Sequence, residues 1–118
     1  MAERADGFER ETEPMASEIP PGVAIEPIFV IEATYGADAA VRRPPVRAEH
    51  LARIAELIRD GRIIEAGGYL DLSTAIMLVR AATEEEALAL IRDDVYLKCG
   101  VLVSVTAKPF GRVVPIDN

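Results

Sequence analysis

Two residues of this chain have the types that acid–base chemistry requires, namely His50 and, far downstream, Asp94. His50 is the single histidine of the sequence, and it stands early in a segment with helical periodicity. An imidazole titrates near neutral pH, and a carboxylate partner fixes its tautomer and raises its basicity. We therefore expect His50 and Asp94 to converge on one pocket as a catalytic pair.

Both residues also have a structural interpretation. A lone histidine beside the buried face of a helix is more often a satisfied structural residue than a catalyst. Asp94 is about as well suited to cap the turn that follows it as to orient a base. The elements that carry the two side chains must therefore decide between these interpretations.

The strands are predicted from runs of β-branched, aromatic and aliphatic residues. These runs cover residues 28–35, 62–66, 74–79 and 101–107. Gly36 follows the first run, Gly67 and Gly68 end the second, and residues 36–44 form a loop.

Two helices are predicted between these strands. Pro44 and Pro45 open the first and Gly61 ends it, and its apolar stripe follows helical spacing at Leu51, Ile54, Ala55 and Ile58. A capping box from Thr83 to Glu86 starts the second. Its inner face carries Ala87, Leu90 and Ile91 and, if the helix persists, Asp94 at its C-terminal end.

The order β-α-β-β-α-β predicts a ferredoxin-like α+β fold with a four-stranded antiparallel sheet. Two helices would cover one face of this sheet and leave the other open. The third strand is apolar on both faces, because Ile76 and Leu78 alternate with Ala75, Met77 and Val79. Since exposed apolar patches usually meet a partner, we expect a homodimer through the open sheet face.

The helical wheel also suggests residues that bind substrate. At about 100° per residue, His50 falls on the shoulder of the apolar stripe and Arg47 falls almost inside it. A cation aimed at an apolar face needs a partner or a ligand, so Arg47 is a candidate for substrate binding. Ser73 and Tyr96 are further candidates, and Tyr35 and Tyr69 could also line a pocket. The far side of the wheel is expected in solvent and carries Glu49, Arg53, Glu56 and Asp60.

The length of 118 residues fits one domain, and the net charge of −7 is unevenly distributed. Residues 1–26 hold seven acidic residues against two basic ones, together with three prolines. This composition predicts a disordered acidic arm, in which Met15 could be the true start. The domain would then span residues 27–113, with a tail over residues 114–118.

Several classes of function find no support. The chain has no basic stripe for nucleic acid, no apolar run of about 20 residues for a membrane span, and no signal peptide. Its one cysteine, Cys99, excludes an internal disulfide, and we expect a cytoplasmic protein. Without metal-ligand spacings or a phosphate-binding glycine loop, we expect no metal and no cofactor.

The same residues resemble the YciI-like (YCII-related) family over about residues 28–112. The likeness rests on Arg47-x-x-His50-Leu51, on the segment from Asp60 to Gly67, on Ser73-Thr74, and on the C-terminal stretch Asp94-x-Tyr96, Gly100-Val101 and Lys108-Pro109-Phe110. This last stretch is the most specific part.

The resemblance implies a dimeric ferredoxin-like fold of the muconolactone isomerase-like group, with an active site at His50 and Asp94. It also implies lyase or isomerase chemistry on small cyclic, hydroxylated compounds. Two departures touch the pocket rim: Val95 stands where the family usually has proline, and the segment from Tyr69 to Leu72 is short.

Three functions therefore stay open. The leading one is a cofactor-free enzyme in which His50 acts as general acid or base, Asp94 orients it, and Arg47 or Ser73 binds a substrate oxygen. The alternatives are a non-catalytic small-molecule binding or accessory module and, on fold analogy alone, a cofactor-independent monooxygenase.

Overall fold

The computed structural model describes residues 18–117, which divide into two units. One unit comprises residues 27–111, and the other combines residues 18–26 with residues 112–117. Most of the predicted acidic arm, Met15 included, lies outside the described residues.

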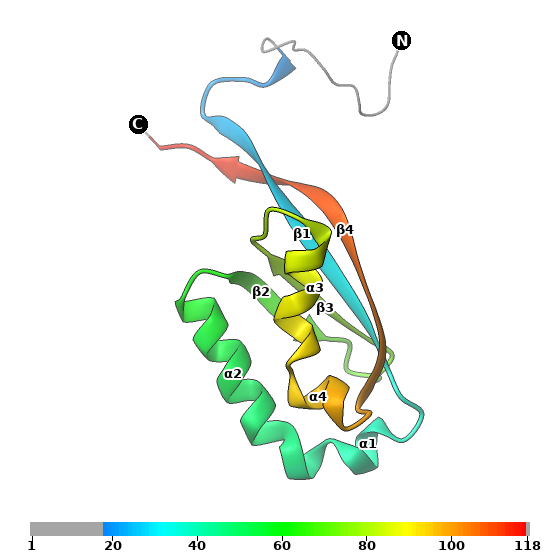
Figure 1. The fold of residues 1–118 in the computed structure, drawn as a ribbon. Helices are drawn as coiled ribbons and strands as arrows, with labels where there is room; N and C mark the ends of the chain where they lie inside the picture. Colours follow the sequence, from blue (N-terminus) through cyan, green and yellow to red (C-terminus); the bar gives the residue numbers. More distant parts are fainter. Residues whose placement is uncertain (1–17, 118) are drawn as a thin grey trace, which may run out of the picture. The chain divides into compact units, whose positions relative to one another are not determined.

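A four-stranded sheet with the order β2-β3-β1-β4 forms the framework of the unit of residues 27–111 (Figure 1). Its strands are β1 (Val23–Tyr35), β2 (Ile63–Gly68), β3 (Thr74–Val79) and β4 (Leu102–Pro115). β3 runs antiparallel to both β1 and β2. Together with the helices between the strands, this order confirms the predicted ferredoxin-like α+β fold.

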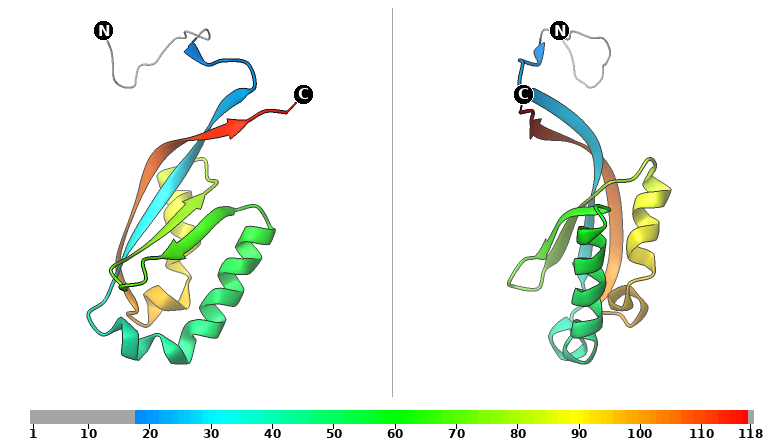
Figure 2. Two further views of the ribbon diagram at one scale, coloured as in Figure 1. Left: turned by 180° about the vertical axis from the view of Figure 1, so that it is seen from behind. Right: turned by 90° about the vertical axis from the view of Figure 1, so that its left-hand side faces the viewer.

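The helices fall into the two crossovers. The first holds α1 (Ala39–Arg42), the 3₁₀ turn η2 (Pro44–Val46) and α2 (Arg47–Arg59), and the second holds α3 (Glu84–Arg92) and α4 (Val95–Lys98). In Figure 1 α3 lies in front of the strands, and in the reverse view of Figure 2 the strands lie in front of α3.

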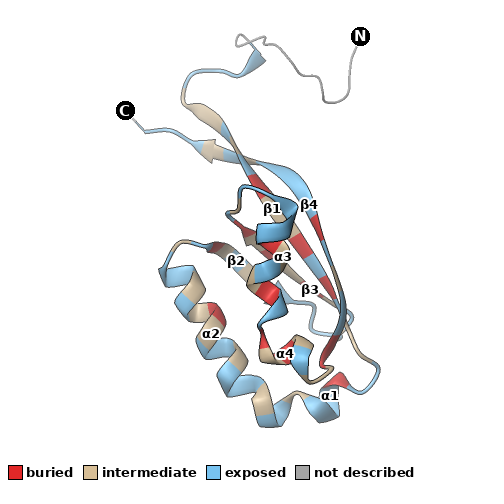
Figure 3. Ribbon diagram, in the orientation of Figure 1, coloured by how far each residue is buried: buried red, intermediate tan, exposed pale blue. Residues whose placement is uncertain are grey.

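The hydrophobic core lies between the sheet and these helices. Ile54 of α2 and Ile91 of α3 belong to one buried cluster with side chains from all four strands, namely Ile31, Ile63, Met77, Val79 and Ala107. Figure 3 shows buried positions on the helices and on the strands that they approach. Both crossovers therefore pack on the same face of the sheet, as predicted.

Small residues occupy one row across this sheet. The register pairs Ala33 of β1 with Ala75 of β3, and Ala75 with Gly68 of β2. A bulge between Ile63 and Glu65 shifts the register of β2. Ala33 packs in a buried cluster with Ala75, and Ala75 and Gly68 line a pocket.

The helix α2 is turned relative to the prediction. Leu51 and Ile58 of the predicted stripe are 51% and 40% exposed, whereas Ile54 is buried. The side of His50 and Leu57 faces inward instead, because α2 packs against both β2 and α4. The helix also begins at Arg47, since Pro44 and Pro45 form η2, and α1 occupies part of the predicted loop.

Asp94 does not extend the helix α3, which was another expectation. α3 ends at Arg92, and Asp94 has an extended backbone with ψ of 139°, which starts the separate helix α4. Gly100, with φ of 82°, then redirects the chain into β4. β2 also continues through Gly67 and Gly68, which were expected to end it.

The second unit contains the outer ends of the two longest strands. The Ile116 N–H donates to the Gly22 carbonyl (2.8 Å), and Arg112 Nη1 donates to Glu26 Oε1 (2.7 Å). Because residues 23–26 are strand, β1 begins five positions before the predicted strand. β4 likewise continues to Pro115, past the predicted end at residue 107.

Candidate active site

Asp94 is a fully buried carboxylate with a local structural role. Its Oδ2 accepts a hydrogen bond from the Tyr96 N–H (2.9 Å), which caps the short helix α4. The side chain is 0% exposed, and it is the one charged residue in the buried class among residues 18–117. Buried charges are tolerated only where partners compensate them, so the surroundings of Asp94 must supply such partners.

His50 is the first partner. Its Nδ1 lies 2.6 Å from the same Oδ2 atom, and its side chain is 14% exposed. A carboxylate can only accept, so Nδ1 carries the proton and donates it. Nε2 has no hydrogen-bond partner among residues 18–117, and in the neutral ring it is the basic nitrogen.

Arg53 is the second partner, and the wheel had placed it in solvent. Its Nη2 donates to the Leu90 carbonyl (2.6 Å), and its Nη1 makes a longer contact of 3.4 Å with Asp94 Oδ1. Arg53 lies on the same side of α2 as His50, three residues further on. Centring the buried arc on His50 rather than on Leu51 would have included Arg53.

These contacts keep Asp94 ionised. Burial by itself raises the pKa of this carboxyl, but the hydrogen bonds from His50 and the Tyr96 N–H, with the charge of Arg53, outweigh it. The net result is an Asp94 pKa below its ordinary value of 3.8. At neutral pH Asp94 is therefore a carboxylate that can stabilise a positive charge on His50.

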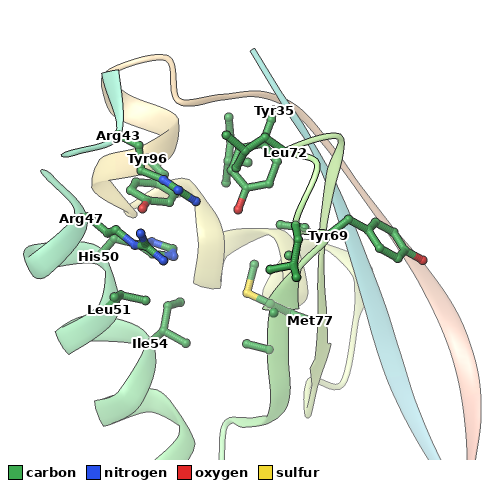
Figure 4. A pocket seen from close by; sticks show the side chains of 16 residues that line it. Tyr35, Arg43, Arg47, His50, Leu51, Ile54, Tyr69, Leu72, Met77 and Tyr96 are labelled. Atoms are coloured by element: carbon green, nitrogen blue, oxygen red, sulfur yellow. The ribbon is translucent and has the colours of Figure 1, made fainter. Parts of the chain in front are cut away.

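A pocket of about 290 Å³ opens beside this pair. In Figure 4, His50, Arg47 and Tyr96 lie on one side of it, and Tyr35 and Leu72 lie across from them. Small residues of the sheet also line it, namely Ala66, Gly67, Gly68 and Ala75. Two of the expected substrate-binding residues, Arg47 and Tyr96, line this pocket, and so does Arg43, which the sequence reasoning missed.

Tyr35 reaches the pocket because the residue facing it lacks a side chain. A Cβ atom placed on Gly68 would lie 2.6 Å from the Tyr35 hydroxyl oxygen. The glycine therefore permits the hydroxyl to approach β2. From the sequence, Tyr35 was only one of three tyrosines that could line a pocket. The approach of its hydroxyl to Gly68 depends on strand register, which the sequence alone does not define.

Ser73, the third expected substrate-binding residue, is exposed and does not line the pocket. Its backbone N–H donates to Asp71 Oδ1 (3.0 Å), a contact that organises the turn between β2 and β3. Leu72, in the same turn, has φ of 59° and does line the pocket. The short turn thus shapes the rim through Leu72.

Neither a metal-binding cluster nor a membrane-spanning helix occurs in the described part of the chain. Residues 18–117 contain no group of three or more His, Cys, Asp or Glu side chains placed to hold a metal ion. Within the same range, no helix is long and apolar enough to cross a membrane.

The fold and pocket define a small α+β domain with a buried histidine–carboxylate pair. The chain is 31% identical to Protein YciI of Escherichia coli and to that of Shigella flexneri, over 96 residues that cover 73% of this chain and 98% of each relative. The chain belongs to the YciI family. No family model matches it.

A solved structure has a similar fold. It is that of 5-chloro-2-hydroxyhydroquinone dehydrochlorinase (TftG) from Burkholderia phenoliruptrix, in complex with 2,5-dihydroxybenzoquinone. The likeness has a TM-score of 0.61 and 18% sequence identity, and covers 70% of this chain and 92% of that one. At this identity the likeness shows a shared fold.

Proposed function

We propose that this protein is a small cofactor-free enzyme of the lyase or isomerase type, acting on a small cyclic or hydroxylated compound. The observation that carries the proposal is the 2.6 Å contact between His50 Nδ1 and the buried carboxylate of Asp94, at the wall of a pocket. The dehydrochlorinase activity named for TftG, on a hydroxylated ring, supports the same class of chemistry.

His50 is the general base in this proposal. With its proton on Nδ1 held by Asp94, Nε2 takes a proton from a substrate carbon next to a carbonyl, or from a ring hydroxyl. The electron pair released from that bond forms an enolate-type anion. Expulsion of a leaving group then gives elimination, and return of the proton to another carbon gives isomerisation. Asp94 stabilises the imidazolium that exists between these steps.

Arg47 and Tyr96 are the candidate groups for stabilising the enolate-type oxygen, since both line the pocket beside His50. Burial raises the pKa of the Tyr96 hydroxyl, although the charges of Arg43 and Arg47 act in the opposite direction. The hydroxyl therefore stays protonated at neutral pH and can donate a hydrogen bond to a developing anion.

We also propose that the protein works as a homodimer. Ile76 and Leu78 lie on the face of β3 opposite the core side chains, and both are only half-buried. They border a second hollow of about 300 Å³ with Tyr69 of the neighbouring turn. A second copy of the chain would remove this apolar surface from water.

Turnover measurements on a panel of lactones and hydroxylated rings, chlorinated hydroquinones included, test the enzyme proposal. His50→Gln should lower kcat/KM by about 100-fold or more on any substrate found, because the base is lost. Glu49→Gln is the matched control, since Glu49 is the exposed neighbour of His50 on α2 and should leave turnover unchanged.

The same panel separates the alternatives. If His50→Gln retained full turnover, the base assignment would be wrong. If ligands bound to the wild type without reaction, and His50→Gln changed only their affinity, the protein would be a binding module.

A further inference from the structure

Two arginines, the half-buried Arg43 and the exposed Arg47, line the pocket without a partner of their own. Arg43 follows α1 and Arg47 begins α2, four residues later, so that η2 holds them on adjacent turns of the chain. Both line the pocket, and Figure 4 shows both close to Tyr96. Among residues 18–117, neither guanidinium has a hydrogen-bond or ion-pair partner.

Most other arginines of the described residues are neutralised by a carboxylate. These are Arg42, Arg53, Arg59, Arg92 and Arg112, each within hydrogen-bond distance of an Asp or Glu oxygen. The pocket lining, in contrast, contains no Asp or Glu, although the chain has 20 acidic residues. Asp94, the buried partner of His50, is not among the residues that line the pocket.

The pocket is therefore a positive region in a protein of net charge −7. Two neighbouring cations repel each other, and an anion placed between them relieves that repulsion. Guanidinium groups match carboxylate oxygens in a planar, bidentate geometry. Ala66, Gly68 and Ala75 also line the pocket, and such small apolar residues leave room for a flat ring.

We propose that the pocket takes a ring compound that carries a carboxylate, and that Arg43 and Arg47 together bind this carboxylate. This inference rests on the proposed function, because it names the substrate class of the same pocket. It makes Arg43 a specificity-determining residue, distinct from the base at His50, and it leaves the enolate-type oxygen to Tyr96. The 2,5-dihydroxybenzoquinone bound in TftG has no carboxylate, so the inferred substrate differs from that compound.

Calorimetric titration with two probes tests the proposal. The probes are 2,5-dihydroxybenzoate and hydroquinone, which share the two para-related hydroxyl groups on the ring and differ by the carboxylate. The wild type should bind 2,5-dihydroxybenzoate about 10- to 100-fold more tightly, as expected for hydrogen bonds to a charged group. Rising salt should weaken binding of the benzoate and leave that of hydroquinone unchanged.

The variants assign this preference to the two arginines. Arg43→Gln and Arg47→Gln should each bring the affinities for the two probes about 10-fold closer. Arg59→Gln removes an equal charge from the exposed end of α2 and should leave the preference intact. Equal binding of the two probes by the wild type, no binding of the benzoate, or an unchanged preference in Arg43→Gln would overturn the proposal.

His50→Gln separates this inference from the proposed function. The variant should lose turnover and keep its preference for the carboxylated probe. Loss of the preference in Arg43→Gln alongside full turnover in His50→Gln would contradict the enzyme proposal alone. Loss of turnover in His50→Gln alongside an unchanged preference in Arg43→Gln would contradict the carboxylate site alone.

Discussion

The imidazole of His50 lies parallel to the ring of Tyr96, with ring centroids 3.6 Å apart and 6° between the planes. Asp94 Oδ2 accepts hydrogen bonds from both His50 Nδ1 and the backbone N–H of Tyr96. Asp94 and Tyr96 therefore restrain the imidazole together, one at its edge and the other at its face. Such restraint fixes both the tautomer of His50 and the direction of Nε2.

Replacing Asp94 with asparagine should remove the charge that stabilises the His50 imidazolium. An amide can still cap α4 by accepting from the Tyr96 N–H, so the variant should fold. We expect kcat/KM to fall about 100-fold or more, and the free energy of unfolding to fall by about 1–3 kcal/mol. Asp93→Asn is the control, because Asp93 is the exposed neighbour. Equal turnover in the two variants would contradict the pairing.

The stability of the protein should depend on Asp94 in acid. Its pKa is lowered in the folded state, so the unfolded chain binds a proton more readily in the range just below the ordinary value of 3.8. The contribution of Asp94 is therefore complete above about pH 5 and is lost as the pH falls through the folded-state pKa. Urea unfolding from pH 6 to pH 2 should show this loss in the wild type and a smaller one in Asp94→Asn. Parallel pH curves for the two proteins would contradict it.

Arg53→Gln should loosen the support of Asp94. The change removes a hydrogen bond to the Leu90 carbonyl and a cation beside a buried carboxylate. We expect a loss of about 1–3 kcal/mol in the free energy of unfolding, measured by chemical denaturation. Arg59→Gln, at an exposed ion pair on the same helix, should cost less than about 1 kcal/mol. Equal losses of unfolding free energy in Arg53→Gln and Arg59→Gln would contradict the supporting role of Arg53.

Gly68 and Gly67 offer a matched test of the pocket wall. A methyl group on Gly68 meets the Tyr35 hydroxyl, whereas a methyl group on Gly67 has no atom within 4 Å. Gly68→Ala should displace Tyr35 and lower ligand affinity about 10-fold, by the loss of about one favourable contact. Gly67→Ala should bind ligand as the wild type does, because Gly67 pairs with Ile76 and its added methyl group would lie on the face of β2 opposite to that of Gly68. Titration of both variants with 2,5-dihydroxybenzoate makes the comparison, and equal affinities would contradict the assigned wall.

Leu78→Lys tests the proposed homodimer. A charge buried without a partner in an apolar interface loses its water, so the variant should dissociate at concentrations where the wild type stays associated. Sedimentation velocity measures both states. Ala52→Lys is the control, because Ala52 is exposed on α2, away from the open sheet face, and this variant should stay associated. A monomeric wild type at micromolar concentration would refute the dimer.

The sequence predicted the elements that local signals define. The capping box is an example, because Thr83 Oγ1 accepts the Glu86 N–H (3.1 Å) and α3 starts there as expected. The apolar run of β3 likewise has the predicted bounds. The contact of His50 with Asp94 is also present, although Asp94 reaches it as the cap of α4 rather than from the end of α3.

The remainder depends on tertiary contacts that no local pattern encodes. The wheel centred the buried arc on Leu51, whereas the opposite shoulder of α2 faces inward, where His50 and Arg53 contact Asp94. Arg43 enters the pocket because η2 stands between α1 and α2. Helices as short as α1 carry little periodicity, so their presence follows from packing.

The tautomer of His50 tests the central claim most directly, because the whole chain has one histidine and its ring signals need no further assignment. Long-range ¹H–¹⁵N NMR of the neutral imidazole distinguishes a protonated nitrogen from a basic one. The proposed geometry predicts the proton on Nδ1 and a basic Nε2. A neutral ring that carries its proton on Nε2 in the wild type would contradict the proposed base.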